Sequence, residues 1–475
     1  MGTINNCYLL QRATRRDNLE YKEKISDTKE VRKKIYSMIL PITIENVLQM
    51  TAGFVSMAMI GRIDAIAIAS LGLSTRITQI IWALFKGVTT GGSVFVAQAY
   101  GSGNIKKVKH IIQQTLLSSI VLVFMLQQLV FWKAPLLLKI FNPKPGLLAN
   151  AVIYLKIASW GLPFVAVMLV VAGVLQATGN AKTPMKIALI MNLTNIIFSF
   201  ILIFGKFGMP VMGIRGAATA TVIAQVTGAT LGIYVLFNRE GMLSSLFNKK
   251  FFKLDLKQVS KVYRVGMPTA FESIFWQISA IILTRIILSF GEVAMASYQL
   301  GLQAESISYM PAMGFGVAAT AFIGQAVGAK DEMLGRKYMK ELVKGSAILT
   351  SISAFILIFF PGAVMRLLTN DAEVIKIGMV YLIIMGLVQL PQNISGVLNG
   401  ALRGAGYTKV PMIVAGVGIW AIRVPLSLLL TYKFNMSIKA IWMVIGLDLI
   451  VRFVLSLTLY RTRDIYNKQL VFEEK

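Results

Sequence analysis

Apolar residues along the chain occur in long runs that are separated by short polar loops. Twelve runs are long enough to cross the hydrocarbon core of a bilayer, which takes about 20 residues at about 1.5 Å per residue. The pattern predicts an all-α membrane protein with about twelve transmembrane helices. The predicted spans are 34–61, 66–100, 111–132, 150–177, 186–208, 217–238, 263–290, 294–328, 343–365, 377–402, 411–432 and 440–460.

The second half of the chain repeats the first at a fixed offset. The run GVTTGGSVFVAQAYG from Gly87 aligns with GFGVAATAFIGQAVG from Gly314, an offset of 227 residues (314 − 87). The same offset aligns QATGNAKTPM from Gln176 with RGAGYTKVPM from Arg403. Six spans per half is an even number, so both halves run through the membrane in the same direction. We therefore expect two six-helix lobes, related by a pseudo-twofold axis along the membrane normal, with a substrate cavity between them.

The repeat and the spans together predict the domain organisation. A basic connector separates the two lobes, and its segment FNKKFFKLDLK suits either an interfacial amphipathic stretch or a solvated loop. The predicted parts are a cytoplasmic N-terminal tail (1–33), an N-lobe (34–238), a cytoplasmic linker (239–262), a C-lobe (263–460) and a cytoplasmic C-terminal tail (461–475).

The formal net charge of +27 reflects membrane topology. Most Lys and Arg residues fall in alternate loops, the positive-inside bias, which predicts a multi-pass plasma-membrane protein with both termini in the cytoplasm. Anionic lipids are therefore the expected partners of the basic loops, and nucleic acid is not expected. The single cysteine, Cys7, allows no intrachain disulfide and no cysteine-based metal site. The chain also lacks a P-loop motif, so we expect neither direct ATP drive nor a cofactor.

Several motifs resemble those of the MATE (multidrug and toxic compound extrusion) transporters, bacterial members of the MOP flippase superfamily. They are LQAESISYMPAMGFGVAATAFIGQAVGAKD (302–331), LQATGNAKTPM, ALRGAGYTKVPM, NLTN from Asn192, and Arg423 with Pro425. The resemblance implies secondary active efflux of small organic molecules by sodium or proton antiport, with alternating access between the lobes. Amphipathic, cationic substrates and a monomeric transporter are the corresponding expectations.

Two glutamates are the first candidates for cation coupling. Glu45 lies four residues after Pro41 on the first span, and Glu272 lies four residues after Pro268 on the seventh. A charged side chain at the centre of a bilayer costs about 3 kcal/mol on insertion scales, so it is a functional candidate by default. Proline also loosens the neighbouring helical turn. The alternative is that both glutamates lie near a helix end, in headgroup water.

Glu305 on the eighth span is the third coupling candidate, and a structural ion pair is its alternative role. Arg423 on the eleventh span is a possible partner of either Glu305 or Glu272. Asp448 and Arg452 are spaced i, i+4 on the twelfth span, which predicts a local structural pair.

Further polar and aromatic side chains are predicted to line the substrate or ion cavity. Gln49 and Ser56 continue the helix face of Glu45, and Gln299 and Gln303 share a face of the eighth span. The complete predicted set is Gln49, Ser56, Asn192, Asn195, Ser199, Trp276, Tyr298, Gln299, Gln303, Gln392, Asn393 and Arg423. No metal site is predicted.

The chain departs from the family pattern at three acidic positions. Ser56, Ser199 and Gln392 stand where many members carry aspartate. A serine cannot titrate near neutral pH, although its oxygen can bind sodium. Coupling through Glu45, Glu272 and Glu305 is the favoured explanation, and a different ion or weak coupling is the alternative.

Two further cations lie within the second span, Arg76 and Lys86, and neither has an acidic neighbour at helical spacing. Snorkelling to the membrane surface is the simpler interpretation, and attraction of an anionic substrate group is the other. Among whole-chain functions, a lipid or lipid-linked glycan flippase is the main alternative to drug efflux. An enzyme is not expected, because the only histidine, His110, lies at a predicted membrane edge.

Overall fold

The structure, a computed structural model, describes residues 28–62, 65–141, 143–238, 241–244, 252–467 and 470. All regular elements in these ranges are helices. The first half contains α2 (Thr28–Gly61), α3 (Ala65–Gly101), α4 (Ile105–Lys139), α5 (Pro145–Ser159), α6 (Leu162–Ala177), α7 (Lys182–Phe204) and α8 (Gly213–Phe237). The second half contains α9 (Leu256–Leu288), α10 (Glu292–Gly328), α11 (Glu332–Phe359), α12 (Pro361–Arg366), α13 (Ala372–Gly404), α14 (Lys409–Gly416), η2 (Val417–Arg423), α15 (Val424–Leu428), η3 (Leu429–Lys433) and α16 (Ile438–Thr462).

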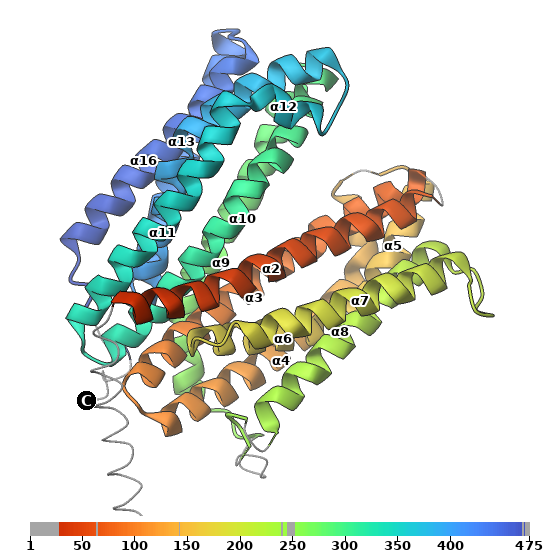
Figure 1. The fold of residues 1–475 in the computed structure, drawn as a ribbon. Helices are drawn as coiled ribbons and strands as arrows, with labels where there is room; N and C mark the ends of the chain where they lie inside the picture. Colours follow the sequence, from red (N-terminus) through yellow and green to blue (C-terminus); the bar gives the residue numbers. More distant parts are fainter. Residues whose placement is uncertain are drawn as a thin grey trace, which may run out of the picture.

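The helices form two bundles that converge at one end of the molecule and diverge at the other (Figure 1). Within the described residues, 11 helices are long and apolar enough to cross a membrane. The short helices α5 and α6 are bent by 51° and together supply a twelfth span. The predicted all-α architecture of about twelve spans in two lobes is confirmed.

Several helix ends differ from the prediction. Helix α2 begins at Thr28, whereas the first span was expected from residue 34. Helix α9 begins at Leu256, so the predicted linker (239–262) extends too far into the C-lobe. Hydropathy marks only the apolar part of a helix, and both helices have polar first turns that continue beyond it. Residues 1–27 and the first five residues of the predicted amphipathic segment (247–251) lie outside the described residues.

The span formed by α14, η2, α15 and η3 winds irregularly. Two π-helical segments, Val417–Arg423 and Leu429–Lys433, flank the short helix that contains Pro425. Proline has no N–H to donate and disturbs the regular ladder of hydrogen bonds. Such π segments occur frequently at functional sites, and this one places Arg423 inside the C-lobe.

Helices α2 and α9 each belong to the cores of both lobes. The first half of α2, with Ile35 and Ile39, packs among residues of α10, α11 and α13, whereas Ile60 near its end packs in the N-lobe. In the same way, Val262 of α9 packs in an N-lobe core and Ile286 packs in a C-lobe core. The two lobes therefore exchange half of one helix each, and these two helices connect them.

The convergent end is closed by a reciprocal pair of contacts between the lobes. The Gln98 side chain donates to the backbone oxygen of Gly404 (3.0 Å), and the Gln325 side chain donates to that of Ala177 (2.7 Å). The offset of 227 residues relates the two donors to each other and the two acceptors to each other. This end holds the beginning of α2 and the ends of α3 and α10, which the charge pattern predicts to face the cytoplasm (Figure 1).

The start of α9 depends on an acidic N-cap. The Asp255 side chain accepts hydrogen bonds from the backbone N–H groups of Lys257 and Gln258 and lies 3.2 Å from His110 of α4. The Gln258 backbone hydrogen bond, aided by His110, holds the pKa of Asp255 below its usual value. A depressed carboxyl pKa contributes stability that is present above the unfolded pKa, near 4, and is lost as the pH falls through the folded pKa.

Asp255→Ala should lower the apparent melting temperature in detergent at neutral pH, because loss of an N-cap costs about 1 kcal/mol. The difference from the wild type should shrink as the pH is lowered below about 4. The control is Asp255→Asn, which retains an N-cap oxygen and should therefore show a smaller fall in melting temperature. Equal losses in both variants would contradict a capping role.

Candidate transport site

Glu45 lies in the middle of α2, and its partner is neutral. The Gln176 side chain at the end of α6 donates to the Glu45 carboxylate at 3.4 Å. Glu45 is 17 residues from the start of α2, about 25 Å along the helix. Its place deep in the span favours the membrane interpretation over the headgroup one. Within the described part of the chain, no basic side chain pairs with it.

Glu272 occupies the equivalent position in α9, and its partner is charged. The Arg403 guanidinium donates to both oxygens of the Glu272 carboxylate, at 2.7 Å each. The sequence suggested Arg423 as a possible partner of Glu272 or Glu305, but Arg423 pairs with Asp448 instead. The repeat contained the signal, because Gln176 and Arg403 align at the same offset as Glu45 and Glu272.

Glu305 is buried in the C-lobe among neutral groups. Tyr381 of α13 donates to its carboxylate at 2.7 Å, and the neutral side chains of Gln389 and Gln392 lie nearby. Asn393 lies in the same network, where it donates to Thr350 at 3.0 Å. The structure thus brings the predicted residues Glu305, Gln392 and Asn393 together.

Arg423 joins the predicted pair of Asp448 and Arg452 in a buried charged triad. Asp448 is fully buried and lies 2.6 Å from Arg423 and 2.7 Å from Arg452. Both guanidinium groups stand over the ring of Trp276, at 5.0 Å and 4.3 Å from its centre. These contacts place Trp276 beside cations of the C-lobe.

The predicted polar residues of the N-lobe form a smaller, neutral network. Ser56 donates to Asn195 at 2.8 Å, and Asn195 donates to Thr221 at 3.4 Å. Asn192 and Ser199 are buried on the same helix, α7. Ser56 and Asn195, singled out separately in the sequence, therefore meet across α2 and α7.

The remaining predicted residues lie in different surroundings. Gln49, Gln299 and Gln303 have exposed side chains. Tyr298 is buried in an aromatic cluster, stacked on Trp442 with ring centres 5.5 Å apart. Across the described residues, no group of three or more His, Cys, Asp or Glu side chains could hold a metal ion.

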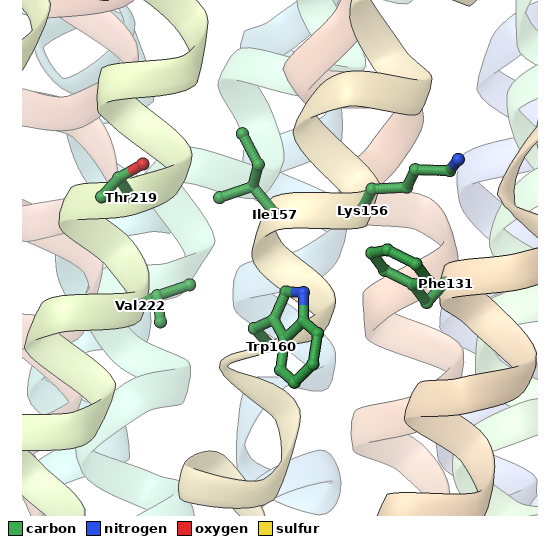
Figure 2. Close-up of a pocket in the computed structure, with 6 residues that line it drawn as sticks. All are labelled: Phe131, Lys156, Ile157, Trp160, Thr219 and Val222. Atoms are coloured by element: carbon green, nitrogen blue, oxygen red, sulfur yellow. The ribbon is translucent and has the colours of Figure 1, made fainter.

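A small apolar pocket within the N-lobe is lined by none of these groups. It has a volume of about 170 Å³ and opens beside the break between α5 and α6. Figure 2 shows its lining residues on α4, α5 and α8: Phe131, Lys156, Ile157, Trp160, Thr219 and Val222. None of the three glutamates lines the pocket, so it is not included in the candidate site.

Two lobes of membrane-spanning helices, joined by α2 and α9 and carrying carboxylates deep in the spans, define a membrane transporter. The MatE family profile matches residues 41–201 and again 268–429, one match in each half. The chain belongs to the MATE family, as its motifs indicated.

Known proteins of the family resemble the chain over nearly its whole length. It is 32% identical to the probable multidrug resistance protein NorM of Thermotoga maritima, over 91% of this chain and 92% of the relative. It is 26% identical to the uncharacterized transporter YisQ of Bacillus subtilis, over 90% and 94%. Among solved structures, a MATE transporter of Vibrio cholerae superposes with a TM-score of 0.85 at 19% identity, covering 92% of this chain and 99% of that one.

Proposed function

We propose that this protein exports amphipathic organic molecules, including cations, by antiport against protons or sodium ions, with alternating access between its lobes. The NorM relatives are named as probable multidrug resistance proteins, which supports drug efflux. The fold supports alternating access, because the lobes converge at one end and diverge at the other (Figure 1).

One observation carries the coupling part of the proposal, namely the contrast between the two equivalent glutamates. Glu272 is neutralised by Arg403, whereas Glu45 has only the neutral Gln176 as its hydrogen-bond partner. A carboxylate deep in a membrane protein without a basic partner is stabilised by a proton or a bound cation. Glu45 is therefore the coupling site that we favour in this chain.

Glu45→Gln should abolish acceleration of transport by an ion gradient. The measurement is uptake of a fluorescent cation into everted vesicles, with a proton gradient and a sodium gradient imposed separately. Wild-type uptake should respond to one gradient, and Glu45→Gln uptake should respond to neither. Thr51→Ala, six residues further along α2, removes a hydroxyl that donates to the backbone oxygen of Val47; it is the control and should retain the response.

Two results would contradict this proposal. A full gradient response in Glu45→Gln would remove Glu45 from coupling. Failure of either gradient to accelerate wild-type uptake would remove antiport itself.

A further inference from the structure

The two halves of the protein surround their equivalent glutamates with the same helix packing. Gly87 of α3 lies against α9, where an added Cβ would be 2.9 Å from the backbone oxygen of Gly266. The equivalent Gly314 of α10 lies against α2, where an added Cβ would be 3.5 Å from the backbone oxygen of Ile39. The offset of 227 residues relates these contacts to each other. Each glutamate therefore lies on a helix that crosses the other lobe at an equivalent place.

The residue before each of these glycines differs in charge between the halves. Lys86 precedes Gly87, and Met313 precedes Gly314. Lys86 lies within electrostatic range of Glu272 and Arg403. Lys86, Glu272 and Arg403 thus form a cluster of one carboxylate and two cations, with a net charge of +1. Its equivalent contains Glu45, a neutral glutamine and a methionine, a net charge of −1 with the carboxylate ionised.

Lys86 lies on a helix that contacts both lobes. Its side chain is exposed, although α3 is enclosed by α4, α5 and α6 of its own lobe and by α9 and α10. Lys86 lies 15 residues before Gly101, the end of α3, or about 22 Å along the helix. This position near the middle of the helix favours an interior role for Lys86 over snorkelling.

Two donors in this cluster have no hydrogen-bond partner among the described residues. Within the described part of the chain, the Lys86 ammonium makes no hydrogen bond or ion pair. Arg403 binds Glu272 through one terminal nitrogen, and its buried Nε has no hydrogen-bond partner. An ammonium and a guanidinium N–H together suit an anionic oxygen ligand, because hydrogen bonds between charged groups are the strong ones.

We propose that Lys86 and Arg403 form an anion subsite that binds a carboxylate of the exported molecule. The substrates then include amphipathic molecules that carry a carboxylate, in addition to simple cations. This inference rests on the proposed efflux function and extends it. The internal repeat explains why the subsite occurs once. The positions equivalent to Lys86 and Arg403 hold the uncharged residues Met313 and Gln176.

The test uses two dyes that differ only in a carboxylate. Tetramethylrhodamine carries a free carboxylate, and its methyl ester carries none. Lys86→Met, which copies Met313, should weaken binding and transport of the free acid at least tenfold and leave those of the ester within twofold. Binding to the purified protein is measured by fluorescence polarisation, and transport is measured in everted vesicles.

Two variants serve as controls. Lys86→Arg should restore binding of the free acid, because it returns a cation to the same place. Arg76→Met removes a cation from the same helix about 15 Å away and should leave both dyes unaffected. Retained binding of the ester shows that Lys86→Met is folded.

The remaining outcomes contradict either the anion subsite or the proposed efflux function. The anion subsite would be overturned if Lys86→Met weakened binding of both dyes equally. It would also be overturned if the variant weakened binding of neither dye. Wild-type protein that binds the ester and not the free acid would overturn it as well. Selective binding of the free acid without transport of either dye would leave the subsite in place and contradict the proposed efflux function.

Discussion

Gly328→Ala should abolish transport, because the lobes can no longer meet at the convergent end. An added Cβ at Gly328 would lie within 2 Å of the backbone oxygen of Gln98, and one at the equivalent Gly101 would lie equally close to that of Gln325. Backbone atoms on both sides leave no side chain that could move aside. Alanine is otherwise the better helix former by about 1 kcal/mol, so a loss must arise from the crossing.

The expected size of the effect of Gly328→Ala follows from the free-energy cost of overpacking. A penalty of about 2 kcal/mol on the closed arrangement changes a two-state equilibrium about thirtyfold. Spin labels on Lys106→Cys and Met333→Cys, equivalent exposed positions, report the separation at this end when Cys7 is replaced by serine. In Gly328→Ala the population of long distances should dominate.

A matched control separates this effect from glycine loss in general. Gly53 of α2 has no atom within 4 Å of an added Cβ, so Gly53→Ala should transport normally. Wild-type transport and label distances in Gly328→Ala would show that the contact does not hold this end closed.

Asp448→Ala should prevent stable folding of the C-lobe. The substitution leaves Arg423 and Arg452 buried beside Trp276 without their shared carboxylate, and each arginine side chain is only 7% exposed. Removal of one partner from a buried ion pair costs about 3 to 5 kcal/mol. We expect a large fall in the yield of monodisperse protein and in its apparent melting temperature.

Neutral replacement of the whole triad supplies a rescue for this defect. A triple variant, Arg423→Ile, Asp448→Thr and Arg452→Gln, should recover most of the stability, because replacing a whole buried charge cluster by neutral groups costs little. A triple variant as unstable as Asp448→Ala would refute this explanation.

An exposed ion pair provides the comparison for Asp448→Ala. Arg336 and Glu332 pair on the surface of α11, with side chains 69% and 51% exposed. Surface pairs contribute at most about 1 kcal/mol, so Arg336→Met should scarcely change the melting temperature. If Arg336→Met lowered the melting temperature as much as Asp448→Ala, burial of the charges would not be the cause of the instability.

The sequence was sufficient to predict the spans, the two lobes and the family. Long apolar runs have few alternatives to a transmembrane helix, and the repeat from Gly87 to Gly314 relates the halves without reference to structure. The i, i+4 pair of Asp448 and Arg452 was also predictable, because both residues lie on one helix.

Contacts between helices were less accessible from the sequence. Arg403 was recognised only as part of a motif after the tenth span, yet it neutralises Glu272 from another helix. Hydropathy reports how deep a residue lies and not which neighbour it faces. For the same reason it could not show that α2 and α9 cross between the lobes.

The exchange of half-helices between the lobes has a consequence for biosynthesis. The start of α2 is made first, but its neighbours in the core, among them Phe315 and Leu342, are translated only after the whole N-lobe. Val262 and Val265 of α9 in turn complete an N-lobe core that is otherwise already made. The core of the first half therefore remains incomplete until the second half is synthesised. A gene divided between α8 and α9 should yield stable protein only when both fragments are expressed together.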